Sequence, residues 1–357
     1  MGTAVLTAGV VGCGNIAGAY ADDLTRFPEI DFRGVTDVDP VRAVEFAKKY
    51  DVRAYGSVDE MLADPEVDVV VNLTTHHAHF DISRRALAAG KHVHSEKPLC
   101  MTPAEAAELL DLAREKGLRL GCSPSTFMGE AQQTVMKWVR DGRLGKVRVV
   151  YAEANWGRIE VWHPAPQAFY EAGALFDVGV YPLTIATAMF GPARRVTAFG
   201  TVVHPRRRML DGGEFTIETP DWVTAVVELE DGTVLRLTAN FYVSGGRQRG
   251  MEFHGDDGLL TIDSWQDFHA PVAFTAFGSD TPEPVTPVRP PHQGIEFGRA
   301  VQDMALAIAE DRPHRATGEQ AAHLVDILDA IRRSSLDGTP VEITSRFDRP
   351  AVMEWAH

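Results

Sequence analysis

A glycine-containing turn near the start of the chain has the residue types that a diphosphate site needs. An apolar run, Ala4 to Val11, predicts a buried strand, and Gly12-x-Gly14-x-x-Ala17 follows it before a helical pattern. Gly12 permits a tight turn from strand to helix, and Gly14 lets the backbone come close to a pyrophosphate. Ala17 is small enough for the helix to pack closely against the strand. The pattern predicts a turn that can hold a dinucleotide.

The residues around this turn indicate which dinucleotide it would hold. Asn15 and Ile16 stand at the start of the helix, where free N–H groups and the helix dipole attract phosphate. A second predicted strand, Phe32 to Thr36, ends at Asp37. A carboxylate there accepts hydrogen bonds from the adenosine ribose and repels a 2′-phosphate, which favours NAD over NADP. The alternative is that the glycines are ordinary turn residues and Asp37 is a loop carboxylate.

A lysine with possible acid–base chemistry follows another predicted strand. Glu96-Lys97-Pro98 comes after the strand Lys91 to His94, and the proline keeps Lys97 out of the helical region. We expect its ammonium to face the crevice at the carboxyl end of the sheet. An ammonium that is partly desolvated beside a positively charged nicotinamide gives up its proton more easily. Glu96 would hold the lysine or contact the nicotinamide end. The alternative is a surface ion pair before a turn.

A carboxylate and a phenol form a second candidate group. Asp177 and Tyr181 are four residues apart in the apolar segment Gly173 to Pro182, so they share one face if the segment is helical. A carboxylate in apolar surroundings needs a partner, and a substrate hydroxyl or Lys97 could provide one. Tyr181 could pass a proton to the reacting oxygen. The alternative is an aspartate that caps a helix beside a core tyrosine.

Aromatic and basic residues ahead of Asp177 are candidates for substrate contacts. Trp162 could stack on the C–H face of a sugar, while Arg158 and His163 could bind hydroxyls or a carboxylate. The alternative is that these residues pack within a loop and contact no substrate.

Two further clusters carry basic side chains. Arg206-Arg207-Arg208 predicts a solvated loop, with the binding of a phosphate or an acid as the alternative. His76, His77 and His79 could hold a metal, but no cysteine or carboxylate accompanies them in the sequence. We therefore expect no metal site.

The elements that must position these residues fall into two patterns. Up to about residue 122, apolar strands alternate with helices that Asp39, Ser57 and Thr102 are expected to cap, which predicts a doubly wound parallel sheet. Strands between Val147 and Asp263, with a hairpin turn at Asp231-Gly232, then predict a large, open, mostly antiparallel sheet. Pro282 to Pro291 predicts a loop, and helices are expected over Ile295 to Glu310 and Gly318 to Leu336. The predicted fold is α/β, with a Rossmann domain over 1–123, an α+β domain over 124–357, and the active site between them.

Composition narrows the class of partner. The formal charge of −15 disfavours nucleic acid and anionic membranes, and no run of 18 apolar residues is present. The three cysteines, Cys13, Cys100 and Cys122, have no metal-site or disulfide-framework spacing. The apolar start of the chain lacks the basic residues that lead a signal peptide. We therefore expect a cytoplasmic protein.

Taken together, the motifs resemble the Gfo/Idh/MocA family of sugar and polyol oxidoreductases. The glycine turn, Glu96-Lys97-Pro98 and Asp177-x-Gly179-x-Tyr181 stand in that family's order, and the resemblance covers nearly the whole chain. It implies that Lys97 is the catalytic lysine and that Asp177 orients the substrate. Many members have histidine where this chain has Tyr181. The chain is more similar to the branch with Lys and Tyr, which includes glucose–fructose oxidoreductase and dihydrodiol and xylose dehydrogenases.

The resemblance also implies roles outside these motifs. Thr74 and His76 would contact the cofactor, and His79 would support their loop. A homodimer or homotetramer would form through the sheet of the second domain. Members of this branch often use NADP, whereas Asp37 favours NAD.

The expected activity is hydride transfer between NAD and a sugar, polyol or related cyclic alcohol, with Lys97 and Tyr181 as acid and base. One alternative retains the cofactor but recycles it, in an epimerase, lyase or glycosidase reaction that passes through a transient ketone. The other alternative is a non-catalytic NAD-binding sensor.

Overall fold

The chain divides into two compact units in the computed structural model, which describes residues 6–357. Unit 1 contains the chain up to Ser125 and the segment Glu296–Val325, and unit 2 contains Thr126–Ile295 and Asp326–His357. The division passes through helix α10 (Gly318–Asp337). Residues 296–325 therefore pack with the first unit, although the predicted domain 124–357 includes them. Ala4 and Val5 of the first predicted strand lie outside the described residues.

Unit 1 is built on a six-stranded parallel sheet of order β3-β2-β1-β4-β5-β6, which is the Rossmann order. Its strands are β1 (Leu6–Val11), β2 (Ile30–Thr36), β3 (Arg53–Ala54), β4 (Val69–Asn72), β5 (His92–Ser95) and β6 (Leu120–Cys122). Its helices are α1 (Ala17–Arg26), α2 (Pro40–Tyr50), α3 (Val58–Ala63), α4 (His79–Ala88), α5 (Pro103–Lys116), α9 (Arg299–Ala309) and the first part of α10.

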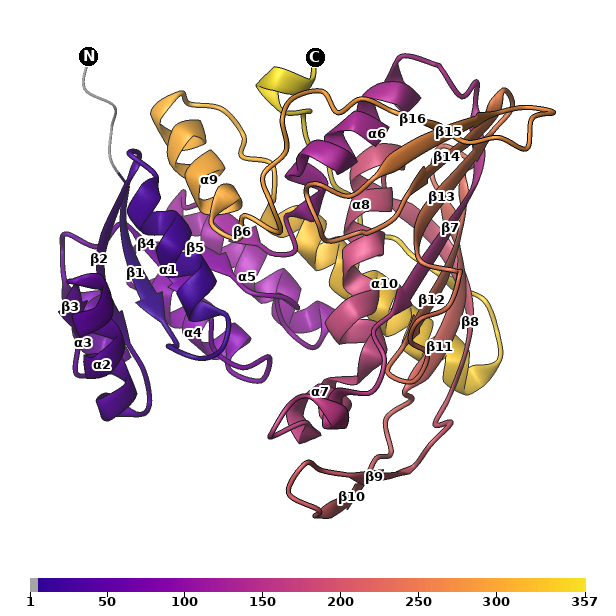
Figure 1. Ribbon diagram of the computed structural model, residues 1–357. Helices are drawn as coiled ribbons and strands as arrows, with labels where there is room; N and C mark the ends of the chain where they lie inside the picture. The colour runs from indigo at the N-terminus through magenta and orange to yellow at the C-terminus, as the bar shows by residue number, and fades with distance from the viewer. Residues whose placement is uncertain (1–5) are drawn as a thin grey trace. The chain divides into compact units, whose positions relative to one another are not determined.

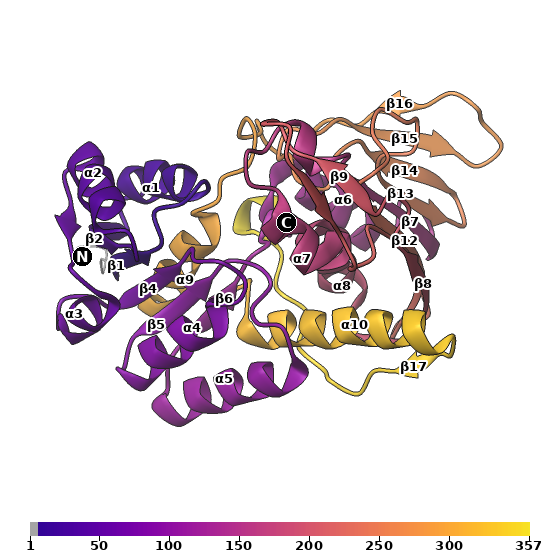
Figure 2. The same cartoon turned by 90° about the horizontal axis from the view of Figure 1, so that it is seen from below.

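Helices cover both faces of this sheet, which explains why the central strands β1 and β4 are largely apolar. One hydrophobic cluster joins the sheet to α1, α2 and α9, and a second joins it to α3, α4 and α5 (Figure 2). The predicted caps are confirmed. Asp39 and Ser57 cap α2 and α3 through their side chains, and Thr102 and Glu105 form a capping box at α5.

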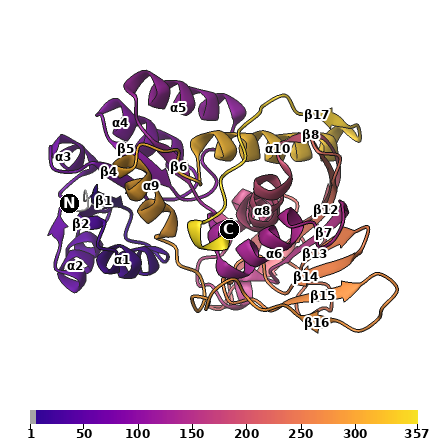
Figure 3. The same cartoon turned by 90° about the horizontal axis from the view of Figure 1, so that it is seen from above.

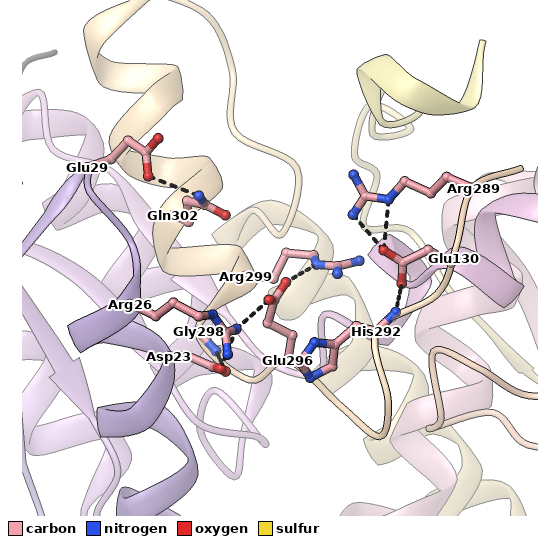
Figure 4. A network of polar contacts seen from close by, with 10 residues as sticks. All are labelled: Asp23, Arg26, Glu29, Glu130, Arg289, His292, Glu296, Gly298, Arg299 and Gln302. Carbon is pink, nitrogen blue, oxygen red and sulfur yellow. Dashed lines mark hydrogen bonds and ion pairs between the residues drawn. The ribbon is translucent and has the colours of Figure 1, made fainter.

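Side-chain contacts explain why α9 belongs to unit 1. Arg26 on α1 contacts Glu296 at 2.5 Å, and Asp23 accepts a hydrogen bond of 2.9 Å from the Gly298 N–H group (Figure 4). Val301 and Met304 are fully buried in the cluster with α1. The helix begins at Arg299, so the prediction that it starts at Ile295 was wrong by four residues.

Unit 2 is built on a nine-stranded sheet of order β16-β15-β14-β13-β7-β12-β11-β8-β17 (Figure 1). Every pairing in it is antiparallel except β12 with β7, so the predicted mostly antiparallel sheet is confirmed. Its strands are β7 (Val147–Asn155), β8 (Ala193–Thr201), β11 (Trp222–Leu229), β12 (Val234–Asn240), β13 (Gly250–Gly255), β14 (Gly258–Ile262), β15 (Val272–Ala276), β16 (Glu283–Pro284) and β17 (Val341–Glu342).

Helices of unit 2 pack on one face of this sheet (Figure 3). They include α6 (Glu130–Arg140), α7 (Gln167–Ala174) and α8 (Val180–Phe190), with the π-helical turn η3 (Leu175–Gly179) between the last two. Short 3₁₀ turns are η1 (Thr126–Met128), η2 (Ile159–Val161) and η4 (Glu354–Ala356). Near the start of α6, the Glu130 carboxylate contacts Arg289 at 2.5 Å (Figure 4).

The segment Gln167–Phe190 is long and apolar enough to cross a membrane by length and composition. It is interrupted at Gly173, whose φ is +80°, and 94% of its most apolar window is buried inside the protein. These are the properties of a core helix. It packs against β12 and β7 as the centre of unit 2.

Two predicted loops contain strands instead. Glu283–Pro284 pairs with β15, so the prediction of a loop throughout Pro282 to Pro291 was wrong. Arg206–Arg208 forms β9, which pairs with β10 (Glu214–Thr216) as a separate two-stranded arm. These strands have only two or three residues each, too few for a period-two pattern to be recognised.

Candidate functional site

Four loops of unit 1 leave the same edge of its sheet. The residues Thr36, Val11, Asn72 and Ser95 are neighbours in register across β2, β1, β4 and β5. Since the strands are parallel, the segments that follow them gather at their carboxyl ends. The predicted cofactor residues of unit 1 all stand in these segments or at the starts of the helices that follow them.

Gly12 makes the tight turn at the end of β1. Its φ is +98°, and a Cβ atom there would lie 2.7 Å from the carbonyl oxygen of Leu73. Its N–H group donates to the Thr36 carbonyl at 2.9 Å. Only glycine satisfies both the positive φ and this close approach.

The next turn residues leave donors available. A Cβ atom on Gly14 would meet nothing within 4 Å, and α1 has no side-chain cap. Within residues 6–357, the N–H groups of Asn15 and Ile16 have no acceptor. Open space, free N–H groups and a helix N-terminus are what a diphosphate requires, so these residues fit the phosphates of a dinucleotide.

Asp37 ties the end of β2 to this turn. Its carboxylate accepts hydrogen bonds from the N–H groups of Cys13 at 2.7 Å and Asp39 at 2.8 Å, and Arg42 lies 3.4 Å away. The side chain is only 6% exposed. An ionised carboxylate has about four acceptor positions, so the two backbone bonds and the bond from Arg42 leave capacity for a ribose hydroxyl.

The loop after β4 is held by two buried residues. The hydroxyl of Thr74 donates to Asn72 Oδ1 at 2.7 Å. The ring of His79 lies between the carbonyl oxygens of Pro98, 2.7 Å from Nδ1, and Thr74, 3.0 Å from Nε2. Burial lowers the pKa of His79. His79 thus joins two loops, while His76 lies half-buried beside His77.

Glu96 is the end of a buried hydrogen-bond chain. The Tyr20 hydroxyl donates to Glu96 Oε1 at 2.7 Å and also lies 2.7 Å from Ser123 Oγ, which His94 Nε2 approaches at 3.3 Å. Because the tyrosine proton goes to the carboxylate, Ser123 donates to Tyr20 and accepts from His94. The other Glu96 oxygen accepts from the N–H group of Lys97 at 3.1 Å. This network fixes the backbone from which the half-buried Lys97 extends.

In unit 2, Asp177 and Tyr181 lie in or beside η3 rather than in one regular α-helix. A Cβ atom on Gly179 would lie 3.1 Å from the Ala239 Cβ, so glycine lets this turn press against β12. Asp177 is half-buried, and the Tyr181 ring lies 5.0 Å from that of Trp265. The sequence provided no signal for Trp265, since its partner is 84 residues away in the chain.

The candidate substrate residues divide into two sets. Trp162 is 46% exposed, and the His163 ring packs edge-on against it at 5.4 Å. Arg158 instead lies over the Tyr242 ring at 5.6 Å. No group of three or more His, Cys, Asp or Glu suited to a metal occurs among residues 6–357.

Two family models cover more than half of the chain. Residues 6–123 match an oxidoreductase family with an NAD-binding Rossmann fold, and residues 132–261 match the C-terminal domain of the same family.

Characterised relatives agree with this match. The dTDP-3,4-didehydro-2,6-dideoxy-alpha-D-glucose 3-reductase of Streptomyces violaceoruber is 29% identical over 92% of this chain and 95% of the relative. The bovine trans-1,2-dihydrobenzene-1,2-diol dehydrogenase (Bos taurus) is 34% identical over 54% of this chain, and the match spans 58% of that enzyme.

Solved structures share the fold across both units. An NAD-binding oxidoreductase from Klebsiella pneumoniae superposes with a TM-score of 0.83 at 23% identity, covering 96% of this chain and 100% of that one. Levoglucosan dehydrogenase, solved with NADH and L-sorbose, superposes with a TM-score of 0.82 at 20% identity, over 95% and 99%. The turn, the sheet order and these matches lead to one conclusion: the chain belongs to the Gfo/Idh/MocA family of NAD-binding oxidoreductases.

Proposed function

We propose that this oxidoreductase is an NAD-dependent dehydrogenase of a sugar, a polyol or a related cyclic alcohol. The observation that carries the proposal is the edge of unit 1, where free N–H groups at Asn15 and Ile16 share one sheet edge with the Glu96–Lys97 loop. The named relatives act on a dTDP-linked sugar and on a dihydrodiol, which supports this class of substrate.

The residues would divide the chemistry as follows. When bound, NAD supplies the hydride acceptor. Asn15 and Ile16 bind its diphosphate, Asp37 its ribose, and Thr74 and His76 contact it from the β4 loop. Lys97, with Tyr181, takes the proton of the substrate hydroxyl, and Asp177 orients the substrate. Trp162 and His163 contact the sugar, and Glu96 keeps the lysine loop in place.

Replacing Lys97 tests the acid–base role. Lys97→Met should lower kcat by about 100- to 10,000-fold, the usual contribution of a general acid–base group, with NAD still bound. Lys116→Met removes an exposed ammonium at the end of α5 and should keep wild-type turnover. Near-normal turnover of Lys97→Met would remove the lysine from the mechanism.

A screen of sugars, polyols and dihydrodiols with NAD and NADP identifies the substrate. Reduced nicotinamide formed in proportion to product supports net oxidation. Conversion without accumulated NADH would favour the recycled reaction instead, and no conversion of any alcohol would favour a sensor.

We further propose a cytoplasmic homo-oligomer that assembles through the sheet of unit 2. Phe199 and Val226 on neighbouring strands β8 and β11 are 57% and 45% exposed on its helix-free face. Light scattering after size exclusion tests this, and Phe199→Glu should shift a dimer or tetramer toward monomer.

A further inference from the structure

Unit 2 contains a cavity of about 250 Å³ whose lining is rich in arginine. It lies between the segment around η2 and the arm formed by β9 and β10, and its wall contains Arg158, Glu160, Val161, His204, Arg206–Arg208 and Glu214. The arm projects from the large sheet beside α7 (Figure 1). Neither the activity proposed above nor any match assigns this cavity a role.

Arg207 is the buried arginine of the cavity wall, and its charge is neutralised by carboxylates. Its side chain is fully buried, contacts Glu160 at 3.0 Å and pairs with the buried Asp221. Its guanidinium also lies 4.8 Å from the centre of the Tyr170 ring. Because Glu160 and Asp221 already neutralise the Arg207 guanidinium, we do not expect it to bind a ligand anion. Its ion pairs instead hold the arm in place.

Three other guanidinium groups of the wall are uncompensated. Arg158, Arg206 and Arg208 form no hydrogen bond or ion pair through their side chains with any described residue. Glu214 stands opposite Arg208 in the register of the arm, yet the two do not pair. Most other arginines of unit 2 have carboxylate partners, such as Arg148 with Asp256 and Arg236 with Glu153.

This grouping is unusual for so acidic a chain. With 50 acidic and 35 basic residues, carboxylates are in excess, yet four guanidinium groups and only two carboxylates line this cavity. One of these carboxylates, Glu160, is paired with Arg207, which leaves Glu214 beside the three uncompensated arginines. Such a group of fixed cations attracts anions in spite of the net negative charge. Guanidinium forks match the oxygens of phosphate in pairs, and the volume lies below the roughly 300 Å³ at which pockets for drug-sized ligands begin.

The cavity also lies near the ends of strands β7 and β12. Arg158 follows β7 and Tyr242, beneath it, follows β12, and these two strands run parallel. η3, with Asp177, presses against the end of β12 at Ala239. The cavity and the turn that contains Asp177 are therefore both next to the end of β12.

We propose that the arginine cavity binds the phosphate or diphosphate group of a phosphorylated ligand, and that it selects a nucleotide-linked sugar as substrate. The second part rests on the proposed function. The first part concerns binding alone and does not depend on turnover.

Calorimetry with inorganic pyrophosphate, thymidine diphosphate and malonate tests the binding. Arg206→Gln/Arg208→Gln should weaken pyrophosphate binding at least tenfold, because both side chains are exposed and the fold does not need them. The control Arg332→Gln/Arg333→Gln removes the same charge from the exposed face of α10 and should change binding less than twofold. Tighter binding of thymidine diphosphate than of pyrophosphate would identify a nucleotide as the source of the phosphate.

Three results would overturn the assignment of the cavity as a phosphate site. These are no saturable binding of pyrophosphate, an equal loss of pyrophosphate affinity in the cavity variant and the α10 control variant, or malonate binding as tightly as pyrophosphate. The experiments distinguish a failure of the dehydrogenase proposal from a failure of the cavity proposal. Pyrophosphate binding that is weakened in Arg206→Gln/Arg208→Gln, without turnover of any alcohol, would refute the dehydrogenase and keep the cavity. Turnover of free sugars without phosphate binding would refute the cavity and keep the dehydrogenase.

Discussion

Gly12 and Gly14 stand two residues apart but differ in what surrounds them. Gly12 has a positive φ, and a Cβ atom on it would clash with the backbone of Leu73, whereas a Cβ atom on Gly14 would meet open space. The first glycine is therefore required by the protein itself. The second is required only if something else fills that space. At the residue scale, we therefore expect Gly12 to be needed for folding and Gly14 to be needed for cofactor binding.

A pair of alanine variants exploits the difference. Gly12→Ala should destabilise the fold by about 1–2 kcal/mol through its left-handed backbone alone, and more through the clash with Leu73. Gly14→Ala should leave the melting temperature unchanged but weaken NAD binding at least tenfold, because its Cβ atom would stand where the diphosphate binds. Thermal unfolding and NAD titration measure both effects. Wild-type NAD affinity in Gly14→Ala would show that the dinucleotide lies elsewhere.

Asp37 and Arg42 should together determine the choice between NAD and NADP. Arg42 is half-exposed and lies 3.4 Å from the Asp37 carboxylate. Asp37→Ser removes the charge that repels a 2′-phosphate and frees the guanidinium to bind one. We expect the ratio of kcat/KM for NADP to that for NAD to rise at least tenfold. Adding Arg42→Gln should reverse most of this gain, and an unchanged ratio in Asp37→Ser would contradict the assignment.

At the scale of elements, the short arm of β9 and β10 depends on one buried ion cluster. Burial raises the pKa of Glu160, but hydrogen bonds from Tyr170 and Arg207 outweigh this and leave the pKa lowered. The carboxylate therefore remains charged and needs its guanidinium partner. Alternation along β9 turns Arg207 inward and leaves Arg206 and Arg208 exposed.

Removing Arg207 should therefore be costly. Arg207→Met leaves Glu160 and Asp221 buried without their partner, and breaking such a pair costs about 3–5 kcal/mol. The matched variant Arg206→Gln should stay within about 0.5 kcal/mol of wild type, as exposed substitutions do. Urea unfolding measures both, and similar stabilities would show that the cluster does not support the arm.

At the scale of the whole molecule, stability should fall in mild acid because two histidines are buried on either side of β6. Burial lowers the pKa of His94 to about 3 and that of His314 to about 4. Each ring stays neutral in the folded protein but binds a proton near pH 6.5 once unfolded. Their contribution to stability is therefore complete above about pH 6.5 and is lost as the pH falls toward 3–4.

As the pH falls from about 6.5 toward 4, each histidine should lower the free energy of unfolding by about 1.4 kcal/mol per pH unit. Urea unfolding at pH 7.5 and pH 5.5 measures the loss. His94→Gln, which cannot take up a proton, should show a smaller difference between the two pH values than wild type. An equal difference would mean that His94 is not the source.

The sequence by itself determined what local patterns encode: the alternation of strands and helices, the glycine turn, the acidic residue after the second strand, the helix caps and the placement of Glu96 and Lys97 after β5. Each of these depends on residues within one or two neighbouring elements, whose backbone preferences and apolar period are visible in the chain. Only the tertiary structure decided that α9 packs with unit 1, that Trp265 meets Tyr181, and that Arg207 is buried while its two neighbours face a cavity. Those outcomes depend on contacts between distant segments, and a single sequence does not show which distant side chains will share a buried space or a charge.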